Sequence, residues 1–385
     1  MNPKDFRSSS TGKVIRTPQG YAAFIPAPLP PLLVYDDDLV LALSRADAAL
    51  SELSGLGRHL PNPHLLIAPY VRREAVLSSR IEGTKASLSD LLLDEMENAA
   101  SVPREEDDVR EVRNYVVALE YGIKRLRDLP LSLRLVRELH ARLMKGVRGE
   151  RATPGEFRRS QNWIGPPGST PATAPYVPPP PEHMQEALAD WERFLHEREK
   201  LPDLIQCALL HEQFEAIHPF LDGNGRVGRL LITLFLTERG RLSQPLLYLS
   251  AYIEAHRQDY YDLLQRARTD GDWIGWLRFF ITGVTETAGE AVRHAGRLMD
   301  LREKFRARLR DKPKALALLD QLFINPYMTV ARAERILKVS NPTARQAVTL
   351  LQKNGMLDEI SGRAWGRLYL AKPILRAIEN PPKPK

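Results

Sequence analysis

A glycine-rich segment followed directly by an apolar helix constrains this chain more than any other part of its sequence. Residues 217–229 read I-H-P-F-L-D-G-N-G-R-V-G-R, and residues 230–236 predict the apolar helix. A helix N-terminus carries unpaired N–H groups and a partial positive charge, so an anion binds there readily. Gly223 and Gly225 flank Asn224 and let successive backbone N–H groups converge into a concave nest. The segment therefore predicts a phosphate site at the start of a helix.

Each polar side chain of this segment suits a step of phosphate chemistry. His218 titrates near neutral pH and can take a proton from a hydroxyl. Asp222 can hold Mg²⁺, because this ion favours one or two carboxylates together with phosphate oxygens and water. Arg226 and Arg229 are three residues apart on a helix, and their guanidinium groups suit the outer phosphates of a nucleotide. Together they predict a phosphate-transfer site that works by positioning and charge neutralisation.

Two other interpretations of the same residues are weaker. Residues 223–228 match the G-x-G-x-x-G pattern of dinucleotide-binding folds, but no β-branched strand precedes them. Residues 222–225 resemble the opening of a calcium loop, but Arg226 stands at a ligand position and no Glu closes the loop. Each of these interpretations explains two or three residues, whereas a phosphate-transfer site explains all of them.

The segment resembles the signature of the Fic family, H-P-F-x-[D/E]-G-N-G-R-x-x-R, and matches it at every fixed position. The resemblance implies transfer of AMP from ATP, with Mg²⁺, to a Ser, Thr or Tyr hydroxyl of a protein, the chain itself included. It makes His218 the general base, Phe220 the core anchor of the loop and Asp222 the Mg²⁺ ligand. Its ATP-binding residues would be Gly223, Asn224, Gly225, Arg226 and Arg229. The related Doc toxin, which phosphorylates its target, has Lys in place of Gly225, and this difference favours AMP transfer.

A second match lies upstream, where residues 78–83 read S-S-R-I-E-G and resemble the inhibitory motif of the family, [S/T]-x-x-x-E-[G/N]. Ser78 and Glu82 belong to the end of a helical stretch predicted over residues 71–81, and Gly83 stands where a helix C-terminus is expected. The resemblance implies that Glu82 reaches Arg229 and occupies the charge that the γ-phosphate of ATP needs. ATP would then bind only in a pose unsuited to in-line attack.

Two further segments belong to the expected site. Residues 162–165 and 174–178 are short apolar pieces separated by turn residues, and they predict a hairpin-like flap. In Fic proteins such a flap pairs with the backbone of the target by strand addition. Downstream, the resemblance places part of the adenine pocket within residues 251–264, where Tyr261 is the preferred contact.

Charge separates the C-terminal tail from the rest of the chain. Residues 311–385 contain 13 Lys and Arg against 6 Asp and Glu, an excess of 7 that equals the net charge of the whole chain. Their pattern of helices and strands resembles a winged helix-turn-helix, a class that binds either DNA or protein. The candidate DNA contacts are Thr343, Arg345 and Gln346 at the start of the recognition helix and Arg363 in the wing.

The expected fold is mainly α: a Fic helical core with a small β-hairpin flap, plus a C-terminal winged helix-turn-helix. Residues 1–31 are expected to form an extended arm, because their proline-rich end discourages regular structure. Four parts are predicted: an N-terminal arm and inhibitory helical region (1–105), a catalytic core (106–290), a linker helix (291–310) and the winged helix-turn-helix (311–385).

Composition excludes some settings and leaves some functions open. Cys207 is the only cysteine, which argues against a disulfide framework and for a cytoplasmic location. The longest apolar run is too short to span a membrane. Two alternatives to AMP transfer stay open: a nucleotide-sensing DNA-binding regulator with little turnover, and transfer of another phosphate-linked group. The sequence does not identify the target protein or the trigger that relieves inhibition, and it leaves a homodimer open.

Overall fold

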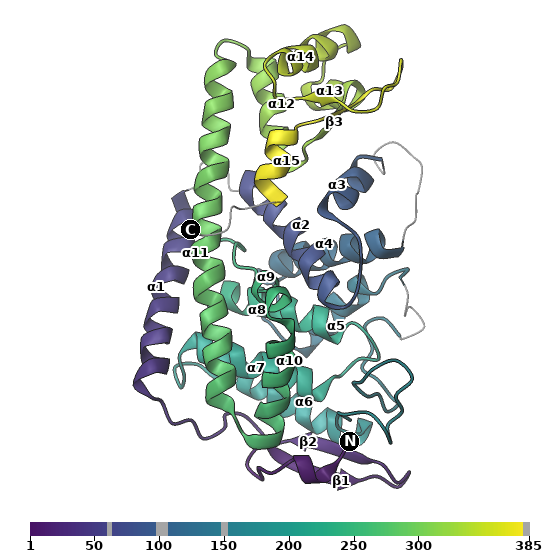
Figure 1. Cartoon of the computed structure of the whole chain (residues 1–385), viewed down its shortest axis with the longest axis vertical. Helices are drawn as coiled ribbons and strands as arrows, with labels where there is room; N and C mark the ends of the chain where they lie inside the picture. Colours follow the sequence, from purple (N-terminus) through teal and green to yellow (C-terminus); the bar gives the residue numbers. More distant parts are fainter. Residues whose placement is uncertain (60–63, 98–106, 148–152, 380–385) are drawn as a thin grey trace.

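The computed structural model describes residues 1–59, 64–97, 107–147 and 153–379. This part of the chain forms fifteen α-helices and two small antiparallel sheets (Figure 1), so the prediction of a mainly α fold is confirmed. The predicted boundary between residues 105 and 106 lies outside the described residues. Among the described residues, no helix combines the length and the apolar composition needed to cross a lipid bilayer.

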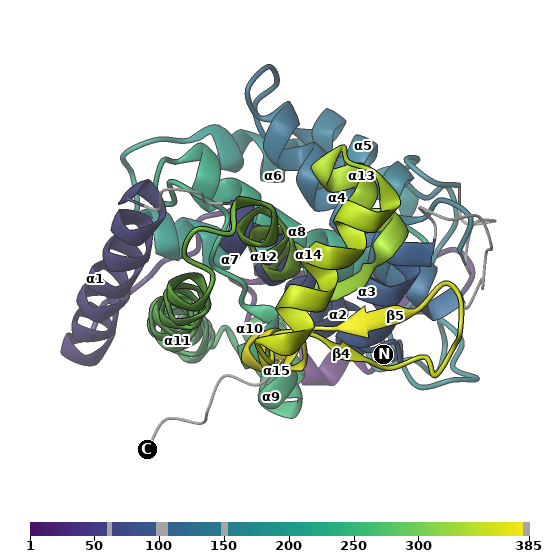
Figure 2. The same ribbon diagram turned by 90° about the horizontal axis from the view of Figure 1, so that it is seen from above.

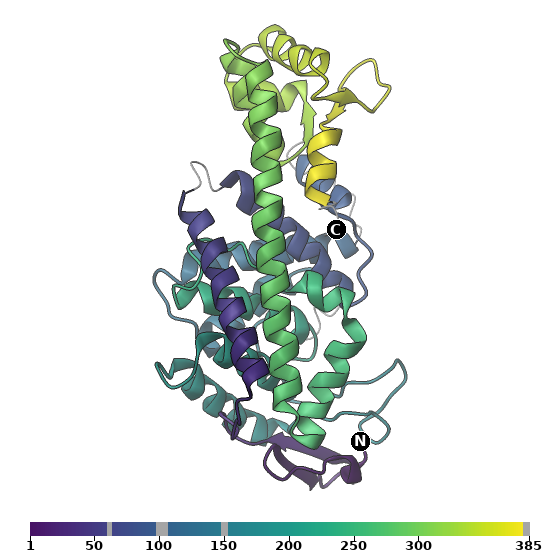
Figure 3. The same ribbon diagram turned by 60° about the vertical axis from the view of Figure 1, so that its left-hand side comes forward.

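One long helix organises the molecule. Helix α11 (Trp273–Arg308) runs almost the full height of the structure, and α1 (Asp37–His59) packs along it (Figure 3). The side chain of Asp272 caps the start of α11 by accepting a hydrogen bond from the Gly275 N–H at 3.0 Å. The helix is unbroken at residue 290, so the predicted linker helix is continuous with a helix of the core.

The centre of the core is an antiparallel pair of helices, α7 (Asp203–Ile217) and α8 (Asn224–Glu238). Every residue of α7 after Asp203 is buried, so this helix is enclosed on all sides. The signature loop joins these two helices and is therefore fixed at both ends. The surrounding helices are α2 (His64–Ile81), α3 (Leu88–Glu97), α4 (Asp107–Arg125), α5 (Leu133–Leu143), α6 (Pro181–His196), α9 (Ser250–Ala255) and α10 (Arg257–Asp270).

The N-terminal region differs from the extended arm that the sequence predicted. Strands β1 (Gly12–Arg16) and β2 (Ala22–Pro26) form a regular hairpin, after a short 3-10 turn at Pro3–Asp5. The Phe24 N–H donates to the Val177 carbonyl at 2.9 Å. This hydrogen bond joins the hairpin to the second piece of the flap, residues 174–178. The prediction was wrong here because the prolines lie at or beyond the end of β2, where they interrupt no strand pairing.

The tail contains the predicted helices and strands together with two elements that the sequence did not predict. The elements in order are α12 (Pro313–Ile324), β3 (Tyr327–Thr329), α13 (Val330–Leu337), α14 (Asn341–Lys353), β4 (Asp358–Glu359), β5 (Leu368–Leu370) and α15 (Lys372–Glu379). Strand β5 lies between β3 and β4, and the loop joining β4 to β5 projects away from the body (Figure 2). Strand β3 and helix α15 are the elements not predicted.

The tail packs directly on the inhibitory region. Helix α12 lies against α2, and β3 lies against α3. The side-chain amide of Asn325 donates to the Leu92 carbonyl at 2.8 Å, and the hydroxyls of Ser89 and Tyr327 are 2.5 Å apart. The tail is therefore part of the same packed body as the helix that ends at Ile81.

Candidate active site

His218 begins the signature loop in a strained backbone conformation. It ends α7 with φ 49° and ψ 61°, in the left-handed region that non-glycine residues rarely adopt. Two buried side chains fix this turn through the His218 carbonyl, which accepts from Arg158 Nε at 3.0 Å and from Asn162 Nδ2 at 3.1 Å. The backbone at His218 is thereby fixed where α7 ends.

The middle of the loop is anchored in the core. Phe220 is fully buried and stacks on His140 at 3.7 Å between ring centroids. The side-chain amide of Asn224 pairs with the backbone of Phe220, accepting from its N–H and donating to its carbonyl, both at 2.8 Å. Phe220 therefore lies where a core anchor is expected. Asn224 closes the loop on itself at the start of α8.

The hydrogen bonds of the His218 ring define its tautomer. Nδ1 lies 3.3 Å from the Glu215 backbone carbonyl, and a carbonyl oxygen can only accept. Nδ1 therefore carries the hydrogen, and Nε2 keeps its lone pair. Burial, with the positive charges of Arg158 and Arg268, lowers the pKa of His218 to about 4, so the ring is neutral and able to accept a proton at neutral pH.

The predicted anion cradle lies at the N-terminus of α8. Gly223 has φ 77°, which glycine adopts without strain, and it leads into the first turn of the helix. Next to it, the side chain of Asp222 is half exposed, and Oδ1 accepts from the Gly223 N–H at 2.6 Å. No cluster of three or more potential metal ligands occurs in the described part of the chain. A lone carboxylate beside a phosphate cradle still fits Mg²⁺, which can complete its coordination with substrate oxygens and water.

Arg229 is buried and clasped by the inhibitory motif. Its Nη2 donates to Glu82 Oε1 at 2.7 Å and to the Ser78 carbonyl at 2.9 Å, and its Nε donates to Ser78 Oγ at 2.8 Å. Burial alone would raise the pKa of Glu82, but the charge and hydrogen bond of Arg229 hold it below the ordinary value. The clasp is thus an ion pair at neutral pH.

Two glycines allow this clasp to form. A Cβ placed on Gly225 would overlap Glu82 Oε1, so only glycine lets the carboxylate approach the start of α8 so closely. Gly83 has φ 98° and open space around its Cα, so it is needed for its backbone conformation and not for room. Gly225 therefore belongs both to the cradle and to the contact with the inhibitory motif.

The other signature arginine is held by a different carboxylate. Arg226 is buried, and its Nη1 lies 3.2 Å from Glu111 Oε2 on α4. The same oxygen accepts a hydrogen bond from Thr84 Oγ1 at 3.0 Å, directly after the inhibitory motif. Arg226 also lies 3.7 Å from Asp222. Glu111 thus connects the inhibitory segment to the first turn of α8.

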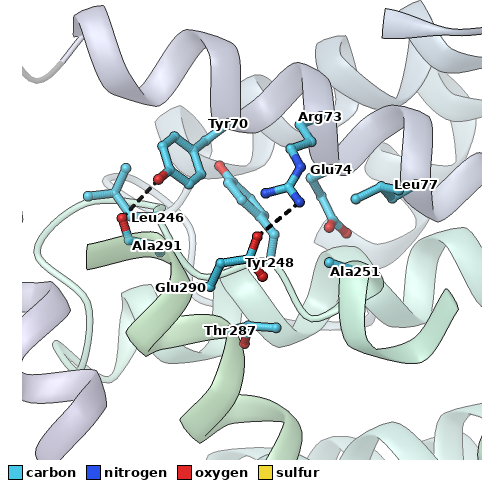
Figure 4. Close-up of a pocket in the computed structure, with 10 residues that line it drawn as sticks. All are labelled: Tyr70, Arg73, Glu74, Leu77, Leu246, Tyr248, Ala251, Thr287, Glu290 and Ala291. Carbon is cyan, nitrogen blue, oxygen red and sulfur yellow. Dashed lines mark hydrogen bonds and ion pairs between the residues drawn. The ribbon is translucent and has the colours of Figure 1, made fainter. Parts of the chain in front are cut away.

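The helix that carries Ser78 is anchored on its other side as well. Figure 4 shows the small cavity where α2 meets α9 and α11, with Tyr70 donating to the Ala291 carbonyl at 2.9 Å and Arg73 paired with Glu290 at 3.1 Å. Glu74 points into the same cavity and is 2 % exposed. Burial raises the pKa of Glu74 to about 7. Hydrogen bonds from Ser250 and Tyr115 act in the opposite direction, but their effect on this pKa is smaller.

A single cavity of about 1290 Å³ brings His218, Glu82 and Arg229 together, whereas Gly223, Asn224 and Arg226 are not part of its lining. Tyr261 from α10 is 41 % exposed and lines it, as expected for an adenine contact. The flap forms another wall, and there Ile164 and Tyr176 make one antiparallel bridge, which is shorter than a full hairpin. The predicted site residues that line the cavity are Glu82, His218, Asp222, Gly225, Arg229 and Tyr261.

The predicted DNA contacts lie in the tail, apart from this cavity. Arg345 and Gln346 are exposed and Thr343 is partly exposed in the first turns of α14, while Arg363 is exposed in the loop between β4 and β5. That loop also carries Trp365, which is 84 % exposed. The sequence analysis did not single out this tryptophan, although its flanking arginines are visible in the sequence.

The sequence analysis also missed the buried residues that support His218. Asn162 was assigned only to the flap, and Arg158, Glu111 and Glu215 were not singled out. Arg158, Asn162 and Glu111 reach the signature segment from distant parts of the chain. Glu215 reaches it from α7, a helix that is buried on every side. The local signal in the sequence is Glu215, a carboxylate three residues before His218.

The sequence of this chain matches known protein families in two ranges. Residues 40–124 match the Fic/DOC family N-terminal domain, and residues 130–236 match the Fic/DOC family domain. The inhibitory motif lies in the first range and the signature in the second. Among curated relatives, a probable protein adenylyltransferase of Aquifex aeolicus is 25 % identical over 315 residues, covering 79 % of this chain and 86 % of that protein.

Other relatives and solved structures agree on the family and the fold. The protein adenylyltransferase Fic of Drosophila grimshawi is 30 % identical over 177 residues, which cover 45 % of this chain and 33 % of that protein. This chain therefore matches about a third of the length of that insect relative. A Fic family protein of Desulfovibrio desulfuricans superposes with a TM-score of 0.56 at 19 % identity, covering 89 % of this chain and 98 % of that one. Fic-1 of C. elegans gives 0.52 at 21 % identity, covering 69 % and 75 %.

Proposed function

Since this chain belongs to the Fic/DOC family, we propose that it is a protein adenylyltransferase that moves AMP from ATP to a Ser, Thr or Tyr hydroxyl of a protein. The observation that carries this proposal is the shared cavity, which is lined by His218, by Arg229 and by Gly225 of the cradle. A neutral base, an anion cradle and a buried guanidinium are the groups that phosphoryl-type transfer needs. The chain itself is a candidate target.

In the proposed reaction, His218 Nε2 takes the proton of the target hydroxyl. The hydroxyl oxygen then forms a bond to the α-phosphorus of ATP, and the bond from that phosphorus to the oxygen bridging to the β-phosphate breaks. Pyrophosphate leaves with the bonding electron pair. The cradle at Gly223, Asn224 and Gly225 would hold phosphate oxygens through backbone N–H groups, with the arginines neutralising the outer phosphates.

The proposed cofactor is Mg²⁺, held by Asp222. When bound there together with ATP, the ion would neutralise phosphate charge and help to orient the nucleotide. Tyr261 would contact the adenine, because it presents a partly exposed ring to the cavity. The flap at Ile164 and Tyr176 would align the backbone of the target by strand addition.

The clasp of Ser78 and Glu82 on Arg229, followed by the helix-ending Gly83, would make the isolated chain autoinhibited. With Arg229 paired to Glu82, the γ-phosphate of ATP loses its guanidinium partner and would have to displace a carboxylate. The proposed activation is withdrawal of Glu82, which frees Arg229.

We also propose that residues 311–385 form a winged helix-turn-helix that binds DNA. The observations in favour are the basic excess of this region and the exposure of Arg345 and Gln346 on α14 and of Arg363 and Trp365 in the loop between β4 and β5. Thr343 would add a contact at the start of α14. A cytoplasmic location is proposed from the cysteine content, since the one cysteine is buried and no disulfide framework can form.

Labelled nucleotide separates the proposed activity from its alternatives. Protein label that comes from α-labelled ATP, and not from γ-labelled ATP, is expected for AMP transfer. Label from γ-labelled ATP alone would mean phosphate transfer instead. ATP that changes DNA affinity without labelling any protein, even in the Glu82→Gly variant, would favour a nucleotide-sensing regulator.

A further inference from the structure

Glu215 carries a buried carboxyl group beside the proposed base His218, and the proposed reaction makes no use of that carboxyl group. It belongs to α7, is 7 % exposed and lines the active-site cavity. One of its oxygens, Oε1, has no hydrogen-bond partner among the residues that the structure describes. An isolated buried carboxylate is costly, so a position of this kind calls for a physical reason.

The residue meets His218 Nδ1 in two ways. Its backbone carbonyl lies 3.3 Å from Nδ1 and fixes the tautomer, and its carboxylate oxygen Oε2 lies 4.0 Å from the same nitrogen. The side opposite Nδ1 therefore stays free for a target hydroxyl. This arrangement places a negative charge where the ring becomes positive after it takes up a proton.

The surrounding charges make such a group necessary. Burial, Arg158 and Arg268 all disfavour a charged imidazole, whereas the charge of Glu82 favours it. In the proposed active form Glu82 has withdrawn, so Glu215 is the acidic side chain that stays beside His218. The charged or titratable groups that face Glu215 are Glu82, His211, Glu212, His218, Arg229, Tyr260 and Arg268.

The packing leaves space for this carboxyl group. A Cβ placed on Gly228 would lie 2.6 Å from Glu215 Oε1, which is closer than real side chains approach. Glycine at position 228, one of the variable positions of the signature, therefore allows Glu215 to lie between α8 and the His218 ring.

We propose that Glu215 is a positioning residue that orients His218 and stabilises its protonated form during AMP transfer; this proposal rests on the proposed function. The proton of the target hydroxyl moves to Nε2, the oxygen bonds to the α-phosphorus and pyrophosphate leaves. Glu215 itself exchanges no atom with the substrates. Burial raises the pKa of Glu215 to about 7, and the charge of Glu82 adds to this, so withdrawal of Glu82 favours the ionised carboxylate.

The test compares variants of the full chain in the Glu82→Gly background. Turnover number and KM for ATP are measured from about pH 5 to about pH 8 for the background alone and for added Glu215→Gln, Glu215→Asp or Glu186→Gln. Glu186 is an exposed carboxylate on α6 and serves as the control. We expect Glu215→Gln to lower turnover at least about tenfold with KM for ATP unchanged.

The pH profile separates this role from a merely structural one. Turnover of the Glu82→Gly background should rise with pH as Glu215 ionises, and Glu215→Gln should remove that rise. Glu215→Asp should keep the rise at a lower turnover, because it retains the charge with a shorter reach. If Glu215→Gln unfolds, Gly228→Ala decides in its place, since the added methyl group displaces the carboxyl group and should lower turnover.

Two results would overturn the proposal and are distinguishable. Turnover and pH profile equal to those of the background, in both Glu215 variants or in Gly228→Ala, would show that Glu215 has no part in the reaction. A Glu82→Gly background that transfers no AMP at any pH would instead overturn the proposed function, and this inference with it.

Discussion

Glu82 and Arg229 are 147 positions apart in the sequence, and their side chains form a direct ion pair at 2.7 Å. The pair joins the end of α2 to the first turns of α8, at the mouth of the cavity that holds His218. It is accompanied by two hydrogen bonds from Arg229 to Ser78. A nucleotide phosphate that binds Arg229 must first displace these contacts. The structure therefore shows Arg229 already occupied by side chains of the same chain.

The first prediction concerns the two partners of this ion pair. Glu82→Gly should raise AMP transfer by about 5- to 150-fold, the usual range of a coupling between two sites, because it frees Arg229 for the γ-phosphate. Arg229→Ala should abolish that gain when the two changes are combined. Transfer rates of the four proteins, measured with α-labelled ATP, give the comparison. An unchanged rate in Glu82→Gly would make Glu82 an ordinary surface carboxylate.

The second prediction separates the two neighbouring serines of α2. Ser78→Ala removes the hydroxyl that accepts from Arg229 Nε, but it leaves the ion pair in place. We therefore expect a rise in transfer smaller than that of Glu82→Gly. Ser79→Ala is the matched control, because Ser79 is also buried and its hydroxyl has no partner among the described residues. Equal effects of the two changes would mean that α2 responds to packing and not to the clasp.

The third prediction concerns the pH dependence of stability. The pKa of Glu74 is raised from 4.5 to about 7 by burial, so the folded state keeps its proton while the unfolded state ionises. The stability linked to this group is therefore fully present below about pH 4.5 and is lost as the pH rises to about 7. Glu74→Gln, which cannot ionise, should gain stability relative to the wild type across that range, about 3 kcal/mol in all. Chemical unfolding at several pH values measures this, and a difference independent of pH would contradict it.

The fourth prediction concerns the basic tail. If it binds duplex DNA, lysines and arginines displace counterions, and the logarithm of affinity should fall steeply with the logarithm of salt concentration. In the full chain, Arg345→Ala should weaken binding by about 1–3 kcal/mol and relax sequence preference. Arg363→Ala should weaken all sequences alike through a lost phosphate contact.

Arg376 on α15 is the control for this experiment, since it is exposed but lies outside α14 and the wing. Arg376→Ala should leave DNA affinity almost unchanged. Absence of duplex binding at low salt would instead identify the tail as a protein-docking module. The catalytic predictions would not be affected, because none of the tail residues up to 379 that the structure describes lines the cavity.

Local signals in the sequence were enough to predict a mainly helical fold. Helix α2 ends at Ile81, the last residue of the helical stretch predicted over residues 71–81. The clasp on Arg229 was expected from the resemblance, and its geometry is present in the structure. Both depend on residues close together in sequence or on a long fixed motif.

The contacts that could not be predicted are those between distant segments. Arg158 reaches the His218 carbonyl across 60 positions, and no local pattern announces such a bond. Strand β3 has three residues and is stable only because β5 pairs with it. Glu215 was overlooked for a related reason: a helix that is buried on every side has no polar face, so position along it does not show which polar residue faces the site.

The most direct test of the central claim is AMP transfer by Glu82→Gly compared with Glu82→Gly/His218→Ala. Both proteins are incubated with α-labelled ATP, Mg²⁺ and a mixture of proteins that includes the chain itself, and thermal melting confirms that both are folded. We predict that Glu82→Gly labels protein and that loss of His218 lowers the rate by about 10²- to 10⁴-fold, because the proton acceptor is gone. Equal labelling by the two folded proteins would contradict the assignment of His218 as the base of an autoinhibited adenylyltransferase.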